Sequence, residues 1–128
     1  MEFEVSTSGR EPIYRQVAEQ VREAVARGRL APGDRLPSVR ELSKLLVVNP
    51  NTIARAYTDL ERDGVLNTRP GLGVFVAAPG SDLTKPARKK RLIERIDSLL
   101  TEAVHLDFSR TETRELIEDR MSQYQWKA

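Results

Sequence analysis

The chain has 128 residues, no cysteine, and a formal net charge of +2 from 21 Lys and Arg against 19 Asp and Glu. This length suits one domain, or one small domain with an accessory element, and leaves little room for a catalytic domain. Without cysteine, disulfide frameworks and thiolate metal sites are excluded, and the near balance of charge means that any polyanionic partner must be argued from where the charges lie. No apolar run resembles a signal peptide or a membrane span, so a cytoplasmic location is predicted, with no membrane partner.

The first predicted element is an amphipathic helix over residues 12–27, preceded by a polar lead. Proline is tolerated at its first turn, and apolar residues recur at helical spacing: Ile13, Val17, Val21, Ala24 and Val25. Gly28 is predicted to end the helix. The following GRLAPGDRLP holds two glycines and two prolines, so an irregular connection is expected, with Leu30 and Leu36 reaching the core.

Two more helices are predicted as a helix-turn-helix. The first starts at Ser38, in a capping box with Glu41, and its buried stripe is expected to be Val39, Leu42, Leu45 and Leu46. After a tight turn at Val47 and Val48, Asn49 is the predicted N-cap and Pro50 the first residue of the next helix. That helix should run to about Asp63, with Gly64 as its left-handed stop.

The last of these helices has two contrasting faces. Helical spacing turns one set of side chains inward: Ile53, Ala56, Tyr57 and Leu60. The opposite face is polar and carries Asn51, Arg55, Thr58 and Arg62, with Thr52 on its shoulder. A helix-turn-helix presents such a face to the major groove of duplex DNA, so we interpret these residues as a reading face.

A β-hairpin is predicted next, from short β-favouring runs at residues 65–69 and 74–78 around the tip Pro70, Gly71, Leu72 and Gly73. It would form the wing of a winged helix-turn-helix domain over residues 1–78. A linker follows at residues 79–86. The expected fold class is mainly α with a small β-hairpin.

Residues 87–128 are predicted to hold two further helices. The first has the apolar stripe Leu92, Ile96, Leu99, Leu100, Ala103 and Val104, and the second starts at a capping box of Ser109 and Glu112. About forty residues in two helices bury too little surface to be stable alone. We therefore expect a homodimerisation element, which is also a place where a small effector could act.

Three motifs, PGDRLPSVREL, VNPNTIARAYTDLERDGVL and RPGLGVFV, occur in this order over about half of the chain. With them the chain resembles the GntR family of bacterial transcription regulators. Its short two-helix tail is similar to that of the YtrA-like subfamily, whose small dimeric members are often concerned with transporter operons. The resemblance implies that Arg40 reads guanine, that Asn49, Asn51 and Thr52 contact phosphates and bases, and that Gly71 enters the minor groove.

Two positions depart from this pattern, because some relatives carry arginine at the positions of Pro50 and Ala54. Half-sites therefore need not be shared with those relatives, and Arg55 is the predicted substitute reader. The full predicted DNA-binding set is Arg35, Ser38, Arg40, Lys44, Asn49, Asn51, Thr52, Arg55, Arg69 and Gly71.

Each of these residues also has a local interpretation. Arg40 can bond to guanine through two N–H groups, or it can pair with a nearby acid on the helix surface. Arg35, Ser38 and Lys44 can hold phosphates, or act only as a loop charge, a helix cap and a solvated charge. Asn49 is a cap first, and Gly71 satisfies hairpin dihedrals in any case.

The tail offers weaker signals. The cationic run over residues 85–91 contacts DNA beside the wing or is a solvated helix start. A single histidine, His105, supplies too few ligands for a zinc site, so no metal or cofactor is expected. Phe108, Tyr124 and Trp126 are expected to pack in the core or dimer interface, with a small-molecule pocket as the alternative.

The sequence thus predicts a dimeric repressor that binds a palindromic operator and regulates a small operon; whether it also responds to a small effector is left open. A protein-interaction module on the same scaffold is the alternative, and it would need an apolar or acidic reading face. An enzyme is not expected, because the chain lacks cysteine, a nucleophile elbow and a metal-ligand cluster.

Overall fold

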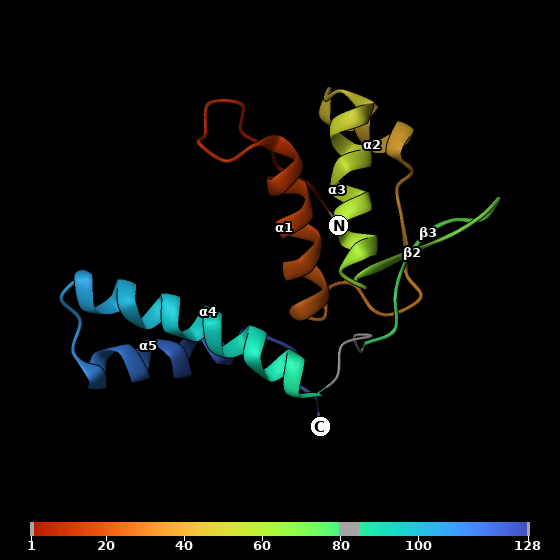
Figure 1. The fold of residues 1–128 in the computed structure, drawn as a ribbon. Coiled ribbons are helices and arrows are strands. Elements are labelled where there is room, and N and C mark those ends of the chain that lie inside the picture. Colours follow the sequence, from red (N-terminus) through yellow and green to blue (C-terminus); the bar gives the residue numbers. More distant parts are fainter. Residues whose placement is uncertain (1, 80–84, 128) are drawn as a thin grey trace. The chain divides into compact units, whose positions relative to one another are not determined.

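The computed structural model describes residues 2–79 and 85–127. Contacts divide the chain into an N-terminal unit, Met1–Gly80 with Gln125–Ala128, and a C-terminal unit, Ser81–Tyr124. The N-terminal unit contains α1 (Ile13–Ala26), β1 (Arg35–Leu36), α2 (Val39–Leu46), α3 (Pro50–Arg62), β2 (Leu66–Arg69) and β3 (Gly73–Val76) (Figure 1). The C-terminal unit contains α4 (Lys85–His105) and α5 (Arg110–Met121). The predicted fold class, mainly α with a small β-hairpin, is confirmed, and the hairpin belongs to a small three-stranded antiparallel sheet.

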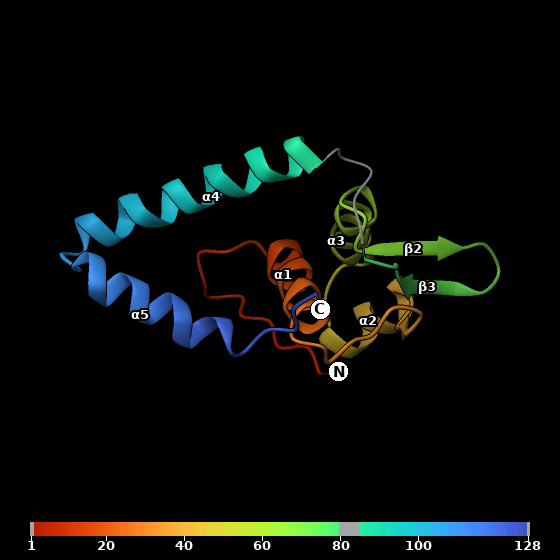
Figure 2. The same ribbon diagram turned by 90° about the horizontal axis from the view of Figure 1, so that it is seen from below.

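The core of the N-terminal unit lies where the three helices meet. α1 packs against α3, and α2 also packs on α3. Both views show α1 and α3 side by side (Figures 1 and 2). The side chains that are completely inaccessible include Val17, Val21, Leu42, Ile53 and Leu60. This packing fixes the helix-turn-helix as one rigid body.

Local signals set the helix ends at the predicted residues, but the capping box predicted at Ser38 and Glu41 is only half formed: the described structure has the bond to the Ser38 hydroxyl, without a return bond from the Glu41 carboxylate. The Ser38 hydroxyl accepts a hydrogen bond from the Glu41 backbone N–H at 3.0 Å, and the Asn49 side chain accepts one from the Asn51 N–H at 2.8 Å. Gly28 and Gly64 follow α1 and α3 with φ of +77° and +76°, a region that favours glycine. The Glu41 carboxylate contacts Arg35 at 4.0 Å, at the long limit of an ion pair.

The connection after α1 is not irregular throughout, which corrects our prediction. Arg35 and Leu36 form β1, which pairs with Phe75 and Val74 of β3 and gives the sheet order β1-β3-β2. Leu36 is 3% exposed. Because its side chain is anchored in the core, the adjoining backbone lies along the otherwise open edge of the hairpin, where its polar groups find partners.

Two predictions about burial were also wrong. In the lead, which was expected to be polar, Phe3 is only 9% exposed and belongs to the core. The Gln16 and Gln20 side chains of α1 hold this segment by accepting hydrogen bonds from the backbone N–H groups of Ser6 and Glu4. In α2, Leu45 is 72% exposed, because the short helix turns Leu42 and Ser43 inward instead.

The C-terminal unit is a hairpin of two helices. α5 starts at a complete capping box: the Ser109 hydroxyl accepts from the Glu112 N–H at 3.0 Å, and the Glu112 carboxylate accepts from the Ser109 N–H at 2.9 Å. These hydrogen bonds lower the pKa of Glu112. α4 already begins at Lys85, within the segment predicted as a linker. The rest of that predicted linker from residue 80 lies outside the described residues.

Almost nothing is buried inside the C-terminal unit. Among its described residues only Thr113 is buried, while the apolar side chains of α4 and α5 remain exposed, including Leu92, Ile96, Leu99, Leu116 and Met121. None of the described helices combines the length and apolar character needed to cross a membrane. The described residues of the two helices therefore present an exposed apolar surface.

Candidate nucleic-acid interface

The turn between α2 and α3 sets the orientation of the reading face. Val47 ends α2 in the left-handed region, with φ of 54°, and its side chain is 90% exposed. A β-branched residue is strained in this conformation, because its Cβ crowds the following carbonyl oxygen. The strain is retained because α2 and α3 are both fixed by the core.

Val47→Gly should therefore stabilise the protein by about 1 kcal/mol, since glycine removes the Cβ clash at a small entropic cost. Equilibrium urea unfolding followed by circular dichroism measures the change. Val47→Ala is the matched control: it keeps a Cβ and should recover only part of the gain. Lower stability of Val47→Gly than of Val47→Ala would show that the turn is not strained.

A hydrogen bond links α3 to the residue that precedes α2. The Tyr57 hydroxyl donates to the backbone carbonyl of Pro37 at 2.7 Å. Burial and the nearby charge of Glu41 raise the pKa of Tyr57, so the phenol stays protonated and remains a donor. This contact fixes α3 relative to the start of α2, where Ser38 and Arg40 lie.

Tyr57→Phe should lower the free energy of unfolding by about 1 kcal/mol, because it leaves the Pro37 carbonyl without its partner while the ring still fills the core. Urea unfolding measures this loss, and the nuclear magnetic resonance shift of the Ser38 amide should move with it. An unchanged midpoint would contradict a structural role for this hydrogen bond.

The exposed side of α3 is polar, as predicted. Asn51, Arg55 and Thr58 are exposed, and Thr52 is half-buried. Arg62 is exposed as well, but its guanidinium contacts Asp59 at 3.1 Å and Asp63 at 3.9 Å. Its guanidinium is therefore already paired with acids of the fold, and the cations of this face that have no such pair in the described structure lie toward the start of α3.

Arg40 and Lys44 project from α2 into solvent. Within residues 2–79 and 85–127, neither has a carboxylate within 4.0 Å. The structure therefore gives no support to the interpretation of Arg40 as half of a surface ion pair. An exposed guanidinium without an acid keeps all its donors available for a planar acceptor pair such as the guanine edge.

The wing brings two more cations together. Arg69 lies over the Phe75 ring at 4.7 Å, and its strand pairs with β3 so that Arg69 is opposite Gly73. A Cβ on Gly73 would meet the Arg35 Nε at 2.9 Å, so Arg35 reaches the same hairpin. Gly71, at the tip, has φ of +76° and open space around it, as close approach to a groove requires.

Arg55 lies differently from its predicted place. The sequence puts it at the centre of the reading face, whereas its guanidinium lies over the Tyr14 ring of α1, with Cζ 3.8 Å from the ring centre. Sequence reasoning missed Tyr14, because α1 was considered only for its core stripe. The contact depends on how α1 packs against α3, which no local pattern reveals.

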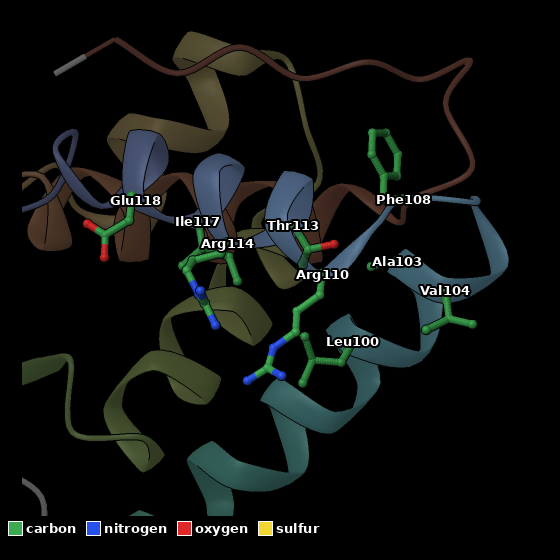
Figure 3. A pocket seen from close by; sticks show the side chains of 9 residues that line it. All are labelled: Leu100, Ala103, Val104, Phe108, Arg110, Thr113, Arg114, Ile117 and Glu118. Carbon is green, nitrogen blue, oxygen red and sulfur yellow. The ribbon is translucent and has the colours of Figure 1, made fainter.

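The C-terminal unit holds a groove of about 490 Å³ between α4 and α5. Leu100, Phe108 and Ile117 contribute apolar surface to it, and the side chains of Arg110 and Arg114 extend from α5 toward Leu100 (Figure 3). Phe108 lines this groove and is 43% exposed, so it is not buried in a core of the described chain. His105 is exposed, and no cluster of metal-ligating side chains occurs among the described residues.

Together these elements define a winged helix-turn-helix transcription regulator. The family model described as "Bacterial regulatory proteins, gntR family" matches residues 13–76, half of the chain. The chain belongs to the GntR family, and the relatives below place it among the YtrA-like regulators.

Two curated relatives from Bacillus subtilis (strain 168) cover most of the chain. The HTH-type transcriptional repressor YtrA is 36% identical over 92 residues, 72% of this chain and 71% of its own length. The HTH-type transcriptional regulator YhcF is 38% identical over 104 residues, 81% of this chain and 85% of its own. Both are regulators rather than enzymes by name.

Solved structures of transcription regulators are similar to this chain as well. A transcriptional antiterminator from Listeria monocytogenes EGD-e covers 100% of this chain and 96% of its own, with a TM-score of 0.84 and 28% identity. YtrA from Sulfolobus acidocaldarius covers 75% and 97%, with a TM-score of 0.60 and 31% identity. The AraR DNA-binding domain in complex with operator ORX1 covers 60% and 99%, with a TM-score of 0.54 and 32% identity.

Proposed function

We propose that this protein is a homodimeric repressor that binds a palindromic operator through α2, α3 and the wing. The observation that carries the proposal is Arg40, which is exposed at the front of a GntR-type helix-turn-helix and has no acid partner among residues 2–79 and 85–127. The AraR domain, similar in fold, is bound to an operator, and the relative YtrA is named a repressor. DNA is cytoplasmic in bacteria, so we also propose a cytoplasmic location.

The C-terminal helices are the proposed dimerisation element, within residues 87–128. Leu92, Ile96 and Leu99 lie on one face of α4 and are 62%, 43% and 47% exposed. An isolated hairpin of two helices that leaves such residues in water forfeits most of its hydrophobic stabilisation. A second copy of the chain, related by a two-fold axis, offers the same apolar face. Packing the two faces together would bury the apolar side chains of both copies.

Repression would follow from occupancy. Two reading faces held by one dimer axis fit two half-sites on successive turns of the major groove, and bound protein would block polymerase at a small operon, its own gene included. The transporter-related target is proposed from the YtrA resemblance. A dimer whose two reading faces can adopt more than one spacing could be controlled by an effector. Such an effector would relieve repression only if it bound the dimer more tightly at a spacing that does not fit the operator.

A protein-interaction module without DNA binding is less well supported. The exposed side of α3 is polar, and its unpaired charge is basic rather than acidic. Leu45 and Val47 are exposed nearby, but two apolar side chains fall far short of an interface core. No feature of the described residues favours an enzyme.

Two measurements on the intact protein test the proposal together. Light scattering should give twice the mass of the 14.5 kDa chain. DNase footprinting upstream of the protein's own gene should show two protected half-sites related by a two-fold axis, and in vitro transcription from that promoter should fall as protein is added. A monomer that protects a single half-site, or undiminished transcription at full occupancy, would refute the proposal.

A further inference from the structure

The contact between Arg55 and Tyr14 joins α3 to α1 at the edge of the reading face. Tyr14 lies in the first turn of α1, and its ring is half-buried against the core. Arg55 lies in the second turn of α3, and its side chain is exposed. The guanidinium carbon is 3.8 Å from the ring centre, the separation of a close cation–π contact.

This contact uses the face of the guanidinium and not its donors. A guanidinium has five N–H groups around its edge, and stacking on a ring leaves that edge in solvent. In the part of the chain that the structure describes, no carboxylate pairs with Arg55. Arg62, two turns further along the same face, is by contrast paired with Asp59 and Asp63.

We propose that Tyr14 is a positioning residue, which holds Arg55 as a preorganised clamp for one phosphate of the DNA backbone. The inference rests on the proposed DNA binding and deepens it. Because the ring draws the guanidinium toward α1, the charge lies beside the reading face rather than at its centre. When a helix lies in the major groove, the sugar-phosphate backbone runs along the sides of that helix, so a charge placed there would meet a phosphate. A side chain held in place before binding loses less conformational entropy when it meets the phosphate.

A phosphate clamp has a different signature from a base reader. Arg55→Ala should weaken binding about tenfold on any duplex, and should reduce the slope of log affinity against log salt by about one, because one fewer counterion is released. Tyr14→Leu should weaken binding about two- to fivefold, since only the positioning is lost. Tyr14→Phe keeps the ring and should bind like wild type.

A double-mutant cycle tests the coupling. Wild type, Tyr14→Leu, Arg55→Ala and the double variant are titrated by fluorescence anisotropy at two salt concentrations. Two duplexes are used: one recovered by selecting a random-sequence library with the wild-type protein, and a scrambled version of it. We expect the double variant to bind like Arg55→Ala alone. An equal loss from Tyr14→Leu with and without Arg55, or a Tyr14→Phe variant as weak as Tyr14→Leu, would overturn the proposal.

The design separates this inference from the proposed function. Thermal unfolding of each variant shows whether Tyr14→Leu acts through stability, and Tyr14→Phe controls for that. Equal affinity of the wild-type protein for the selected and the scrambled duplex, with the coupling intact on both, would refute sequence-specific repression and leave the phosphate clamp standing. Specific binding without coupling between Tyr14 and Arg55 would refute the phosphate clamp and leave sequence-specific repression standing. Absence of binding to any duplex would refute both proposals.

Discussion

Arg40→Ala is expected to remove the preference for guanine at one position of each half-site, by about tenfold to a hundredfold at that position. The reason is geometric: a guanidinium can donate two hydrogen bonds to O6 and N7 of guanine, and no acid holds it elsewhere in the described structure. Selection from a random-sequence library, carried out with wild type and variant in parallel, measures the preference position by position.

Arg40→Lys is the matched control for this experiment. Lysine keeps the charge but loses the planar fork, so it should restore much of the overall affinity and little of the guanine preference. If Arg40→Ala weakens binding equally on all sequences, and lysine restores it fully, Arg40 contacts phosphate and the assignment as a base reader is wrong.

Leu99→Glu is expected to convert the dimer to a monomer and to weaken operator binding about a hundredfold or more. Leu99 is 47% exposed on α4 among the apolar residues of the stripe, so a carboxylate there would be buried unpaired between two copies. Without the dimer, each half-site is bound independently and the gain from linking two sites is lost. Light scattering and anisotropy on the same samples measure both effects.

Ser98→Glu provides the comparison. It adds the same charge one residue earlier, where the exposed side chain lies off the stripe and donates a hydrogen bond to the Glu94 carbonyl of its own helix. This variant should remain dimeric and bind operator like wild type. A dimeric Leu99→Glu variant would place the dimer interface outside α4 and contradict the role proposed for the C-terminal helices.

The helix ends of the helix-turn-helix were predictable because their causes are local. Ser38 and Asn49 cap their helices through backbone groups two or three residues away, and Gly64 adopts its left-handed conformation directly after α3. The polar face of α3 was likewise predictable from the period of the helix. These features need no knowledge of the rest of the chain.

Features set by tertiary packing were not predictable. β1 exists because the anchored Leu36 lies beside β3, and Phe3 is buried because the lead runs along α1. Leu45 is exposed for the same kind of reason: no described residue covers that side of α2. The Tyr14–Arg55 contact joins residues 41 positions apart in sequence (55 − 14), so it becomes visible only once α1 and α3 are seen together.

The most direct test of the central proposal is a fluorescence-anisotropy titration of the wild-type protein against its selected duplex and a scrambled duplex of equal length and composition. It must be run at two salt concentrations, because counterion release alone produces tight binding at low salt. We expect the selected duplex to bind about a thousandfold more tightly, with the preference retained at high salt. Equal affinities for the two duplexes, falling together as salt rises, would contradict a sequence-specific repressor.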